Sequence, residues 1–203
     1  MAYVKAAERE GQIVAAAIRV LSAVGVGGIT TRAVAVEAGI PLGTLHYVFP
    51  SKDKMLRAVI TAVVDDALAT ARAGVELDQG VEHAIRHAVT NVWEKLVEHD
   101  PGLQVMQYEL AMYSVRSEGP GGLARLLCER YAALISEFCE AAARASGERC
   151  AVDFDTLGRL GFAAVDGLIM QYVTNPDPAR ARRDLDRAVD MIVGFADPRP
   201  VSQ

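Results

Sequence analysis

Thr44, His46 and Tyr47 are polar or aromatic side chains that could contact the phosphates, sugars and bases of a DNA double helix. They alternate with Leu45 and Phe49, which are four residues apart and would share one face of a short helix. This spacing predicts that the two apolar side chains anchor the helix while the other three point outward. The chemistry of such a surface is hydrogen bonding and stacking on nucleic acid, as in a recognition helix.

Two short helices and a glycine turn must position these side chains. Thr30 or Thr31 can cap the unpaired N–H groups of the first helix. Gly39 occurs where the end of that helix needs a residue that tolerates positive φ. Pro41 suits the first turn of the second helix, because its missing N–H would be unpaired there. With Ser51 as the cap of a third helix, the sequence predicts a helix-turn-helix DNA-binding unit.

The stretch from Ala38 to Lys52 resembles the DNA-binding domain of the TetR family of transcriptional regulators. The elements that carry the resemblance are Ala38-Gly39, Gly43-Thr44-Leu45, His46-Tyr47 and Phe49-Pro50-Ser51-Lys52. Two residues depart from the pattern: Leu42 replaces a residue that is polar or basic in many members, and Val48 replaces a frequent aromatic. Leu42 could contact a thymine methyl group or no base at all.

The resemblance implies a role for each residue that matches the motif. Thr31 and Thr44 would contact phosphate, and Lys52 would hold the DNA backbone at a helix N-terminus. Arg32 would reach a guanine edge. His46 and Tyr47 would touch phosphate or stack on sugar and thymine methyl, with ordinary surface packing as the alternative for Tyr47. The DNA contacts expected from the resemblance are Thr31, Arg32, Thr44, His46, Tyr47 and Lys52.

The charge of the chain is unevenly divided. Over all 203 residues the net charge is −5, and 51% of the residues are apolar, enough to bury a core in one or two small domains. The first 60 residues carry seven Lys and Arg side chains against four acidic ones, whereas the remainder carries 14 against 22. A weakly basic end on an acidic body fits a protein that meets phosphate at one end only.

Apolar residues recur at helical spacing along the whole chain, which predicts an all-α fold of about nine helices. The head would be a three-helix DNA-binding domain (1–52), with a connecting helix from 51. The body would be a helical bundle (53–203) for ligand binding and dimerisation. After a first helix that ends at 25–28, and the two short helices, the expected helices are 51–74, 81–96, 101–116, 123–145, 153–174 and 179–196. We expect a break at 117–122, no strand, and a frayed tail at 197–203.

The last two helices (about 153–196) are apolar on more than one side. Small residues such as Gly158, Gly161 and Gly167 would let another helix approach closely. Packing against a second copy would make a four-helix bundle and a two-fold homodimer, and a monomer whose own body covers both faces is the alternative. The resemblance favours the dimer, which would recognise a pseudo-palindromic double-stranded DNA operator with half-sites one or more helical turns apart.

The resemblance also implies a pocket for a small-molecule effector among the middle helices and the eighth. Large, polarizable side chains could line it, with one carboxylate as a polar anchor, and would suit an apolar or aromatic effector. Ordinary core packing is the alternative for each of them. The candidates are Trp93, Met106, Tyr113, Phe138, Phe162, Asp166 and Met170.

The sequence gives little support for a metal site, a disulfide, a phosphate-binding loop or a catalytic site. His83 and His87 are four residues apart, a spacing that can bind zinc, but no Cys or acidic pair nearby completes the set, and we expect no metal. Cys128 and Cys139 are too far apart on one helix to bridge within it, which leaves only a disulfide across a dimer. The glycines at 25–28 lack the lysine of a phosphate loop, and we expect neither a catalytic site nor a cofactor.

Three interpretations of function remain. The first is a ligand-responsive DNA-binding transcriptional regulator, a homodimeric repressor released from its operator by a small effector. The second is an all-helical small-molecule carrier with a vestigial DNA-binding head. The third, a small helical hydrolase, has no motif behind it. Residues 1–5 lack the apolar core of a signal peptide, and no run of 18 apolar residues occurs, so we expect a cytoplasmic protein that does not span a membrane.

Overall fold

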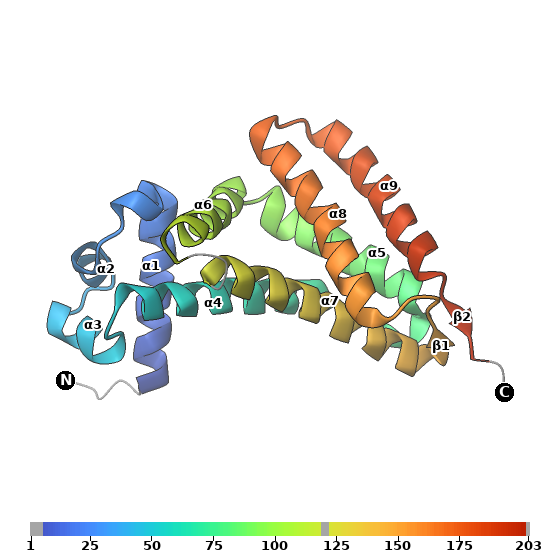
Figure 1. The fold of residues 1–203 in the computed structure, drawn as a ribbon, viewed down its shortest axis with the longest axis horizontal. Helices are drawn as coiled ribbons and strands as arrows, with labels where there is room; N and C mark the ends of the chain where they lie inside the picture. Colours follow the sequence, from blue (N-terminus) through green and yellow to red (C-terminus); the bar gives the residue numbers. More distant parts are fainter. Residues whose placement is uncertain (1–5, 119–121, 202–203) are drawn as a thin grey trace. The chain divides into compact units, whose positions relative to one another are not determined.

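The computed structural model describes residues 6–118 and 122–201, and these residues are helical almost throughout (Figure 1). The predicted all-α fold is confirmed. The α-helices are α1 (Ala6–Gly28), α2 (Thr31–Glu37), α3 (Leu42–Val48), α4 (Lys52–Arg72), α5 (Val81–Val92), α6 (Pro101–Glu118), α7 (Leu123–Ser146), α8 (Phe154–Thr174) and α9 (Pro178–Ala196). A short 3-10 segment, η1 (Leu77–Gln79), precedes α5, and a π-helical segment, η2 (Trp93–Val97), follows it.

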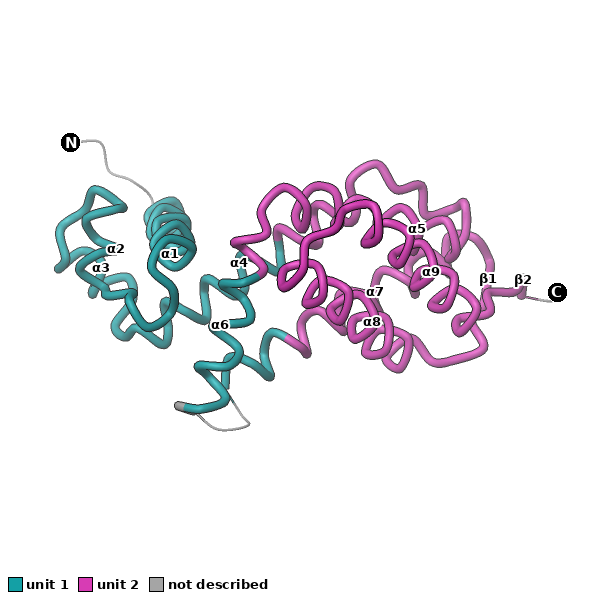
Figure 2. Tube along the Cα trace, turned by 90° about the horizontal axis from the view of Figure 1, so that it is seen from above, with its two compact units in different colours: residues 1–65, 105–127 teal, residues 66–104, 128–203 magenta. Residues whose placement is uncertain are grey.

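The chain divides into two compact units (Figure 2). Unit 1 comprises residues 1–65 and 105–127, and unit 2 comprises residues 66–104 and 128–203. The expected boundary between head and body, at 52/53, falls at the first residues of α4. Most of α6 therefore groups with the helix-turn-helix rather than with the rest of the body.

Unit 1 is built on α1, which packs against α2 and α3. Its side chains Ile13, Ala16 and Ala17 are fully buried, because they recur at the spacing of one helix face. Among the described residues, Ala7–Gly28 is the one helix long and apolar enough to cross a membrane by length and composition alone. A helix that forms the core of a packed domain has the same composition. Residues 1–5, where we expected no signal-peptide core, lie outside the described residues.

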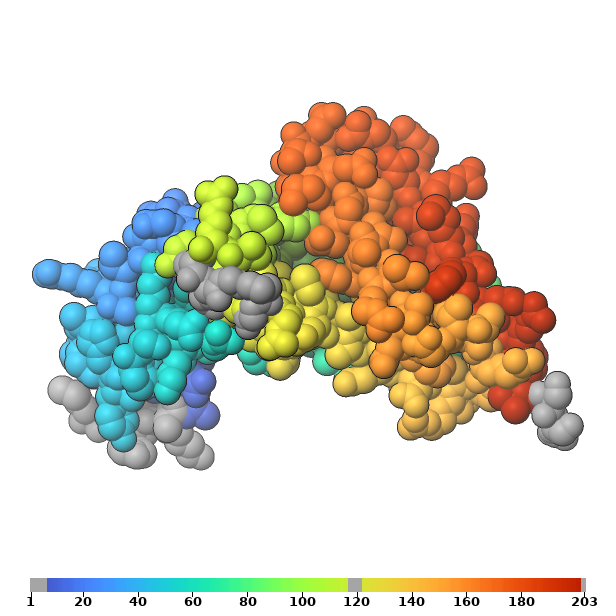
Figure 3. Space-filling view, in the orientation of Figure 1, coloured from blue at the N-terminus to red at the C-terminus, as the bar shows by residue number. Residues whose placement is uncertain are grey.

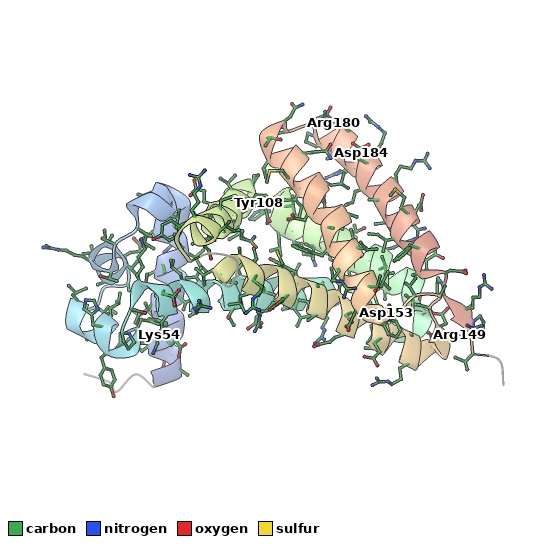
Figure 4. The ribbon with its side chains drawn as sticks, in the orientation of Figure 1. Lys54, Tyr108, Arg149, Asp153, Arg180 and Asp184 are labelled. Carbon is green, nitrogen blue, oxygen red and sulfur yellow. The ribbon has the colours of Figure 1, made fainter. Side chains whose placement is uncertain are left out.

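Unit 2 contains the paired helices α8 and α9, which adjoin as orange and red surfaces in Figure 3. The N-terminus of α8 is capped by Asp153, whose side chain accepts the Thr156 N–H at 2.7 Å (Figure 4). Near this end α8 packs closely against α7. A Cβ added to Gly158 would lie 2.3 Å from the Ala132 carbonyl oxygen. A glycine is required at this crossing.

The expected frayed tail is wrong for residues 197–201. Two-residue strands, β1 (Glu148–Arg149) and β2 (Arg199–Pro200), pair antiparallel. The Val201 N–H donates to the Gly147 carbonyl at 2.8 Å, and the Ala151 N–H donates to the Ala196 carbonyl at 2.8 Å. These backbone pairs hold the chain after α9 against the turn after α7, which local composition could not reveal. Residues 202–203, and residues 119–121 of the expected break, lie outside the described residues.

Candidate nucleic-acid interface and pocket

The first helix of the predicted helix-turn-helix is capped and fixed to α1. Thr30, rather than Thr31, is the N-cap: its hydroxyl accepts the Ala33 N–H at 3.1 Å. At the other end of α2, the Gln12 side-chain amide donates to the Ala38 carbonyl at 2.7 Å. An exposed ion pair joins Arg19 of α1 to Glu37 of α2 at 2.6 Å. These contacts set the orientation of α2 on its supporting helix.

The turn between α2 and α3 uses Gly39 as predicted. Its φ is +65°, and the Ile40 N–H returns to the Ala35 carbonyl at 3.0 Å. Pro41 lies one position earlier than predicted, because it is the N-cap of α3 and not a residue of its first turn. In that position its carbonyl accepts the Thr44 N–H at 2.9 Å, and its missing N–H costs nothing.

The predicted division of α3 into an inner and an outer face is confirmed by burial. Leu45 is fully buried and Phe49, its C-cap, is buried as well. Tyr47 is 88% exposed and His46 is exposed, whereas Thr44 is half-buried. The inner residues hold α3 against unit 1, so that the outer side chains are presented on a rigid support.

Two further predicted DNA contacts lie at the start of α2. Arg32 is exposed, and Thr31, the first residue of the helix, is half-buried. Together with the outer side chains of α3 they supply a guanidinium, hydroxyls, an imidazole and a phenol. These groups can donate hydrogen bonds to phosphate oxygens and to base edges.

Lys52 is engaged within unit 1. Its ammonium donates to the Val26 carbonyl at the end of α1, 3.4 Å away, and lies over the Tyr113 ring of α6, 5.7 Å from the ring centre. Lys54, in the same turn of α4, is exposed (Figure 4), and its backbone N–H donates to the capping hydroxyl of Ser51. Lys54 was not among the predicted DNA contacts, although its place in the first turn after a capping residue was a usable signal.

Unit 2 contains a pocket of about 400 Å³ between α7 and α8. Its volume falls in the range of small-molecule sites. Phe162, one of the predicted ligand residues, contributes to the wall and stacks on Tyr131, with 5.3 Å between ring centres. The pocket is lined by Cys128, Glu129, Ala132, Ala133, Asp155, Arg159 and Phe162. The charged members were not predicted, because a charged residue near a helix end is usually a solvated one.

The surroundings of the cysteine thiols in unit 2 disfavour the thiolate form. Burial raises the pKa of Cys128, and the charge of Asp166, another predicted ligand residue, raises it further. Burial raises the pKa of Cys139 to about 12, with a smaller contribution from Cys150. Because a thiolate is the reactive form, neither environment favours thiol chemistry at neutral pH.

The other predicted ligand residues do not gather around this pocket. Trp93 is buried in a cluster with Tyr172, with 5.5 Å between ring centres, and its indole N–H donates to Glu98 at 3.1 Å. Phe138 is buried in a second cluster of unit 2. Met170 is exposed on α8, and the two remaining candidates belong to unit 1, where Met106 is buried and Tyr113 contacts Lys52. Burial in a core and exposure in a pocket leave the same pattern in a sequence, so periodicity could not separate them.

The outward side of α8 and α9 carries large apolar side chains. Leu160 is 51% exposed on α8, and Met191 is 70% exposed on α9. We call the exposed set the α8/α9 apolar patch, and it consists of Leu160, Ala163, Met170, Met191 and Phe195. Leu160, Ala163 and Met170 recur at helical spacing and so share one face of α8, and exposed apolar faces are typical of surfaces that contact another protein.

The described residues contain no group of three or more His, Cys, Asp or Glu side chains placed to hold a metal ion. The rings of His83 and His87 stack on each other, with 5.8 Å between their centres.

Comparison with known proteins gave matches over most of the chain. The family model described as bacterial regulatory proteins, tetR family, matches residues 13–59, and a model described as tetracyclin repressor-like, C-terminal domain, matches residues 80–194. The HTH-type nicotine-responsive transcriptional repressor HdnoR of Paenarthrobacter nicotinovorans is 27% identical over 184 residues, which are 90% of this chain and 93% of that protein.

Solved structures resemble the fold. A transcriptional regulator from Rhodococcus sp. Rha1 matches with a TM-score of 0.71 at 23% identity, and a putative TetR-family regulator from Rhodococcus sp. matches with a TM-score of 0.76 at 18% identity. Each match covers 94% of this chain and 99% of the other. At these identities the matches speak for the fold alone.

Proposed function

Since this chain belongs to the TetR family of bacterial regulatory proteins, we propose that it is a homodimeric repressor released from a pseudo-palindromic operator by a small apolar or aromatic effector. Regulators of this family are DNA-binding proteins that respond to ligands. The observation that carries the proposal is α3, which presents exposed His46 and Tyr47 while buried Leu45 anchors it. A cytoplasmic location, where the protein can reach chromosomal DNA, follows from this function.

In this proposal α3 enters the major groove and α2 crosses the DNA backbone. Arg32 reaches a guanine edge, Thr31 and Thr44 contact phosphate, and His46 and Tyr47 contact phosphate, sugar or a thymine methyl. Lys52 uses one of its three N–H donors on the Val26 carbonyl, which leaves fewer of them for phosphate. We therefore add Lys54, which is exposed in the same turn, as a phosphate contact.

The homodimer would form through α8 and α9. The α8/α9 apolar patch supports this, because a second copy of the same patch would remove its apolar surface from water. Gly167 and Gly194 have no atom within 4 Å of an added Cβ, so neither is explained by a close approach within one chain. Small residues at these positions would let the helices of a partner lie close.

The effector would bind within the helical body (53–203) and favour a conformation in which the two heads no longer fit adjacent half-sites. The pocket between α7 and α8 supports the involvement of Phe162, which lines it. The involvement of Asp166 is supported by its charge, which raises the pKa of Cys128, another residue of the lining. Trp93, Met106, Tyr113, Phe138 and Met170 remain proposed contacts. Because a relative is described as nicotine-responsive, nicotine is the first compound to test.

The decisive experiment is a gel shift of the full-length protein with duplex DNA from the region flanking its own gene, at several salt concentrations. A repressor should bind one such duplex, with an affinity that falls steeply as salt rises, because phosphate contacts release counterions. Arg32→Ala should weaken the binding, whereas Arg144→Ala, at an exposed position of α7 outside both proposed interfaces, should leave it unchanged. A small-molecule carrier with a vestigial head would bind no duplex in a salt-dependent manner, and this outcome would reject the proposal.

A further inference from the structure

The recognition helix lacks the side chains that usually identify bases. The residues of α3, all of them described by the structure, are Leu42, Gly43, Thr44, Leu45, His46, Tyr47 and Val48. None of them is Arg, Lys, Asn, Gln, Asp or Glu. Paired hydrogen bonds to guanine come from Arg or Lys, and those to adenine come from Asn or Gln. This helix can make neither.

The first turn of α3 presents one large side chain to solvent, and it is apolar. Leu42 is 39% exposed, Thr44 is half-buried and Leu45 is fully buried. At Gly43 an added Cβ would have no atom of the described residues within 4 Å, so the backbone beside Leu42 has open space next to it. The N-terminal residues of a recognition helix are those that contact base edges. The apolar side chain of Leu42 therefore lies at the N-terminal position from which a recognition helix contacts base edges.

From this arrangement we infer that Leu42 selects a thymine in each operator half-site through the thymine C5 methyl group; the inference rests on the proposed DNA-binding function of α3. In the major groove thymine offers a methyl group beside its O4 acceptor, and none of the other three bases carries a methyl group there. Packing Leu42 against one of those edges would remove it from water without a hydrogen-bond partner, which is unfavourable. Against the methyl group both surfaces are apolar, and their burial is favourable.

The test removes the methyl group and nothing else. The operator is first selected from a pool of random duplexes with the full-length protein. Each thymine of the selected half-sites is then replaced by deoxyuridine, and affinity is measured by fluorescence anisotropy at fixed salt. For the thymine at Leu42 we expect a loss of about 4-fold in one half-site and about 16-fold in both, since burial of one methyl group is worth about 0.8 kcal/mol.

Two variants assign the effect to Leu42. Leu42→Ala should bind the thymine and uracil duplexes equally well at that position, because the side chain that touches the methyl group is shortened. Val24→Ala shortens an exposed apolar side chain of α1 in the same unit and should keep the full difference. Both replaced side chains are solvent-exposed, and unchanged thermal unfolding verifies that each variant is folded.

The possible outcomes separate this inference from the proposed function. If a sequence is selected, yet no uracil replacement has an effect that Leu42→Ala abolishes, the inference about Leu42 is rejected and DNA recognition stands. If no sequence is enriched and no duplex is bound in a salt-dependent way, the proposed function fails and the inference fails with it.

Discussion

Tyr47 is the residue at which exposure and function are most closely linked. A phenol ring that is 88% exposed makes few contacts within the protein, so it is available to contact a partner. Tyr47→Ala should weaken operator binding by about 1–3 kcal/mol, since it removes a contact that the folded protein does not use. Fluorescence anisotropy with a labelled operator at fixed salt measures the change.

Tyr47→Phe is the matched control, because it keeps the ring and removes only the hydroxyl. If stacking on sugar or thymine methyl dominates, Phe should retain most of the affinity, and if a phosphate hydrogen bond dominates, Phe should resemble Ala. Equal affinity of all three proteins would remove Tyr47 from the interface.

Glu98 stabilises unit 2 in a pH-dependent way. Its carboxylate accepts two hydrogen bonds from Arg182, at 2.9 and 2.6 Å, and one from the buried Trp93 indole. The hydrogen bonds from Arg182 hold the pKa of Glu98 below its ordinary value of 4.5, against the opposing effect of burial. A lowered pKa in the folded state means that this stabilisation is complete above pH 4.5 and is lost as the pH falls toward the folded value.

Glu98→Gln should therefore lower the midpoint of thermal unfolding by about 2–4 °C at pH 7, and by less as the pH falls below 4.5. Thermal unfolding followed by circular dichroism at pH 7 and at a pH below 4.5 measures this. Glu140→Gln, which breaks an exposed ion pair with Arg144 within α7, should have little effect at either pH. A loss of the same size for Glu98→Gln at both pH values would contradict the role of the charge.

At the same scale, the sequence predicted the local geometry of α2 and α3 better than the surroundings of the proposed ligand residues. Leu45, Phe49 and Gly39 act as local patterns require, since helix spacing and positive φ depend on nearby residues. For Lys52 the sequence predicted a position at a helix N-terminus but not its contacts, because its partners Val26 and Tyr113 are distant in the sequence.

At the scale of the elements, helix crossings depend on individual glycines. Gly158→Ala would bring a methyl group within 2.3 Å of the Ala132 carbonyl oxygen, and backbone cannot yield as a flexible side chain can. We expect the free energy of unfolding to fall by about 1–3 kcal/mol as α7 and α8 are forced apart. Urea unfolding measures this change.

Gly11→Ala is the control for this prediction. Gly11 lies within α1, where an added Cβ would meet no atom within 4 Å, so the higher helix propensity of alanine should raise stability by up to about 1 kcal/mol. If Gly158→Ala were also stabilising, the close crossing of α7 and α8 would be disproved.

The helices could be predicted from periodicity and capping, but their irregular parts could not. Asp153 marks the start of α8 in sequence and in structure, since capping is a local interaction. The expected helix at 81–96 changes to π-helical geometry at Trp93, where the indole pairs with Glu98 five residues later. The strand pair of β1 and β2 joins segments some fifty residues apart, and two-residue strands leave no alternation to detect.

At the scale of the whole molecule, the expected functional unit is a two-fold pair of chains. One recognition helix of seven residues offers few contacts, so a single chain would hold one half-site weakly. Joining two chains through α8 and α9 makes the second half-site contact intramolecular and raises the affinity without any new contact. Sequence periodicity predicts this pairing because α8 is apolar on more than one side, and the proposal of a particular face rests on which side chains of both helices are exposed in a single chain.

Leu160→Glu tests the pair directly. Leu160 is 51% exposed in one chain, so glutamate at this position should not disturb folding, but in a two-fold interface each copy would bury an unpaired carboxylate. A cost of about 3–5 kcal/mol should weaken dimerisation more than a hundredfold, and light scattering should report a single chain of 21.7 kDa. Operator affinity should fall with it, whereas Val24→Glu, at an exposed position of α1, should leave the dimer intact. A dimer that persists in Leu160→Glu at micromolar concentration would show that the α8/α9 apolar patch is not the interface.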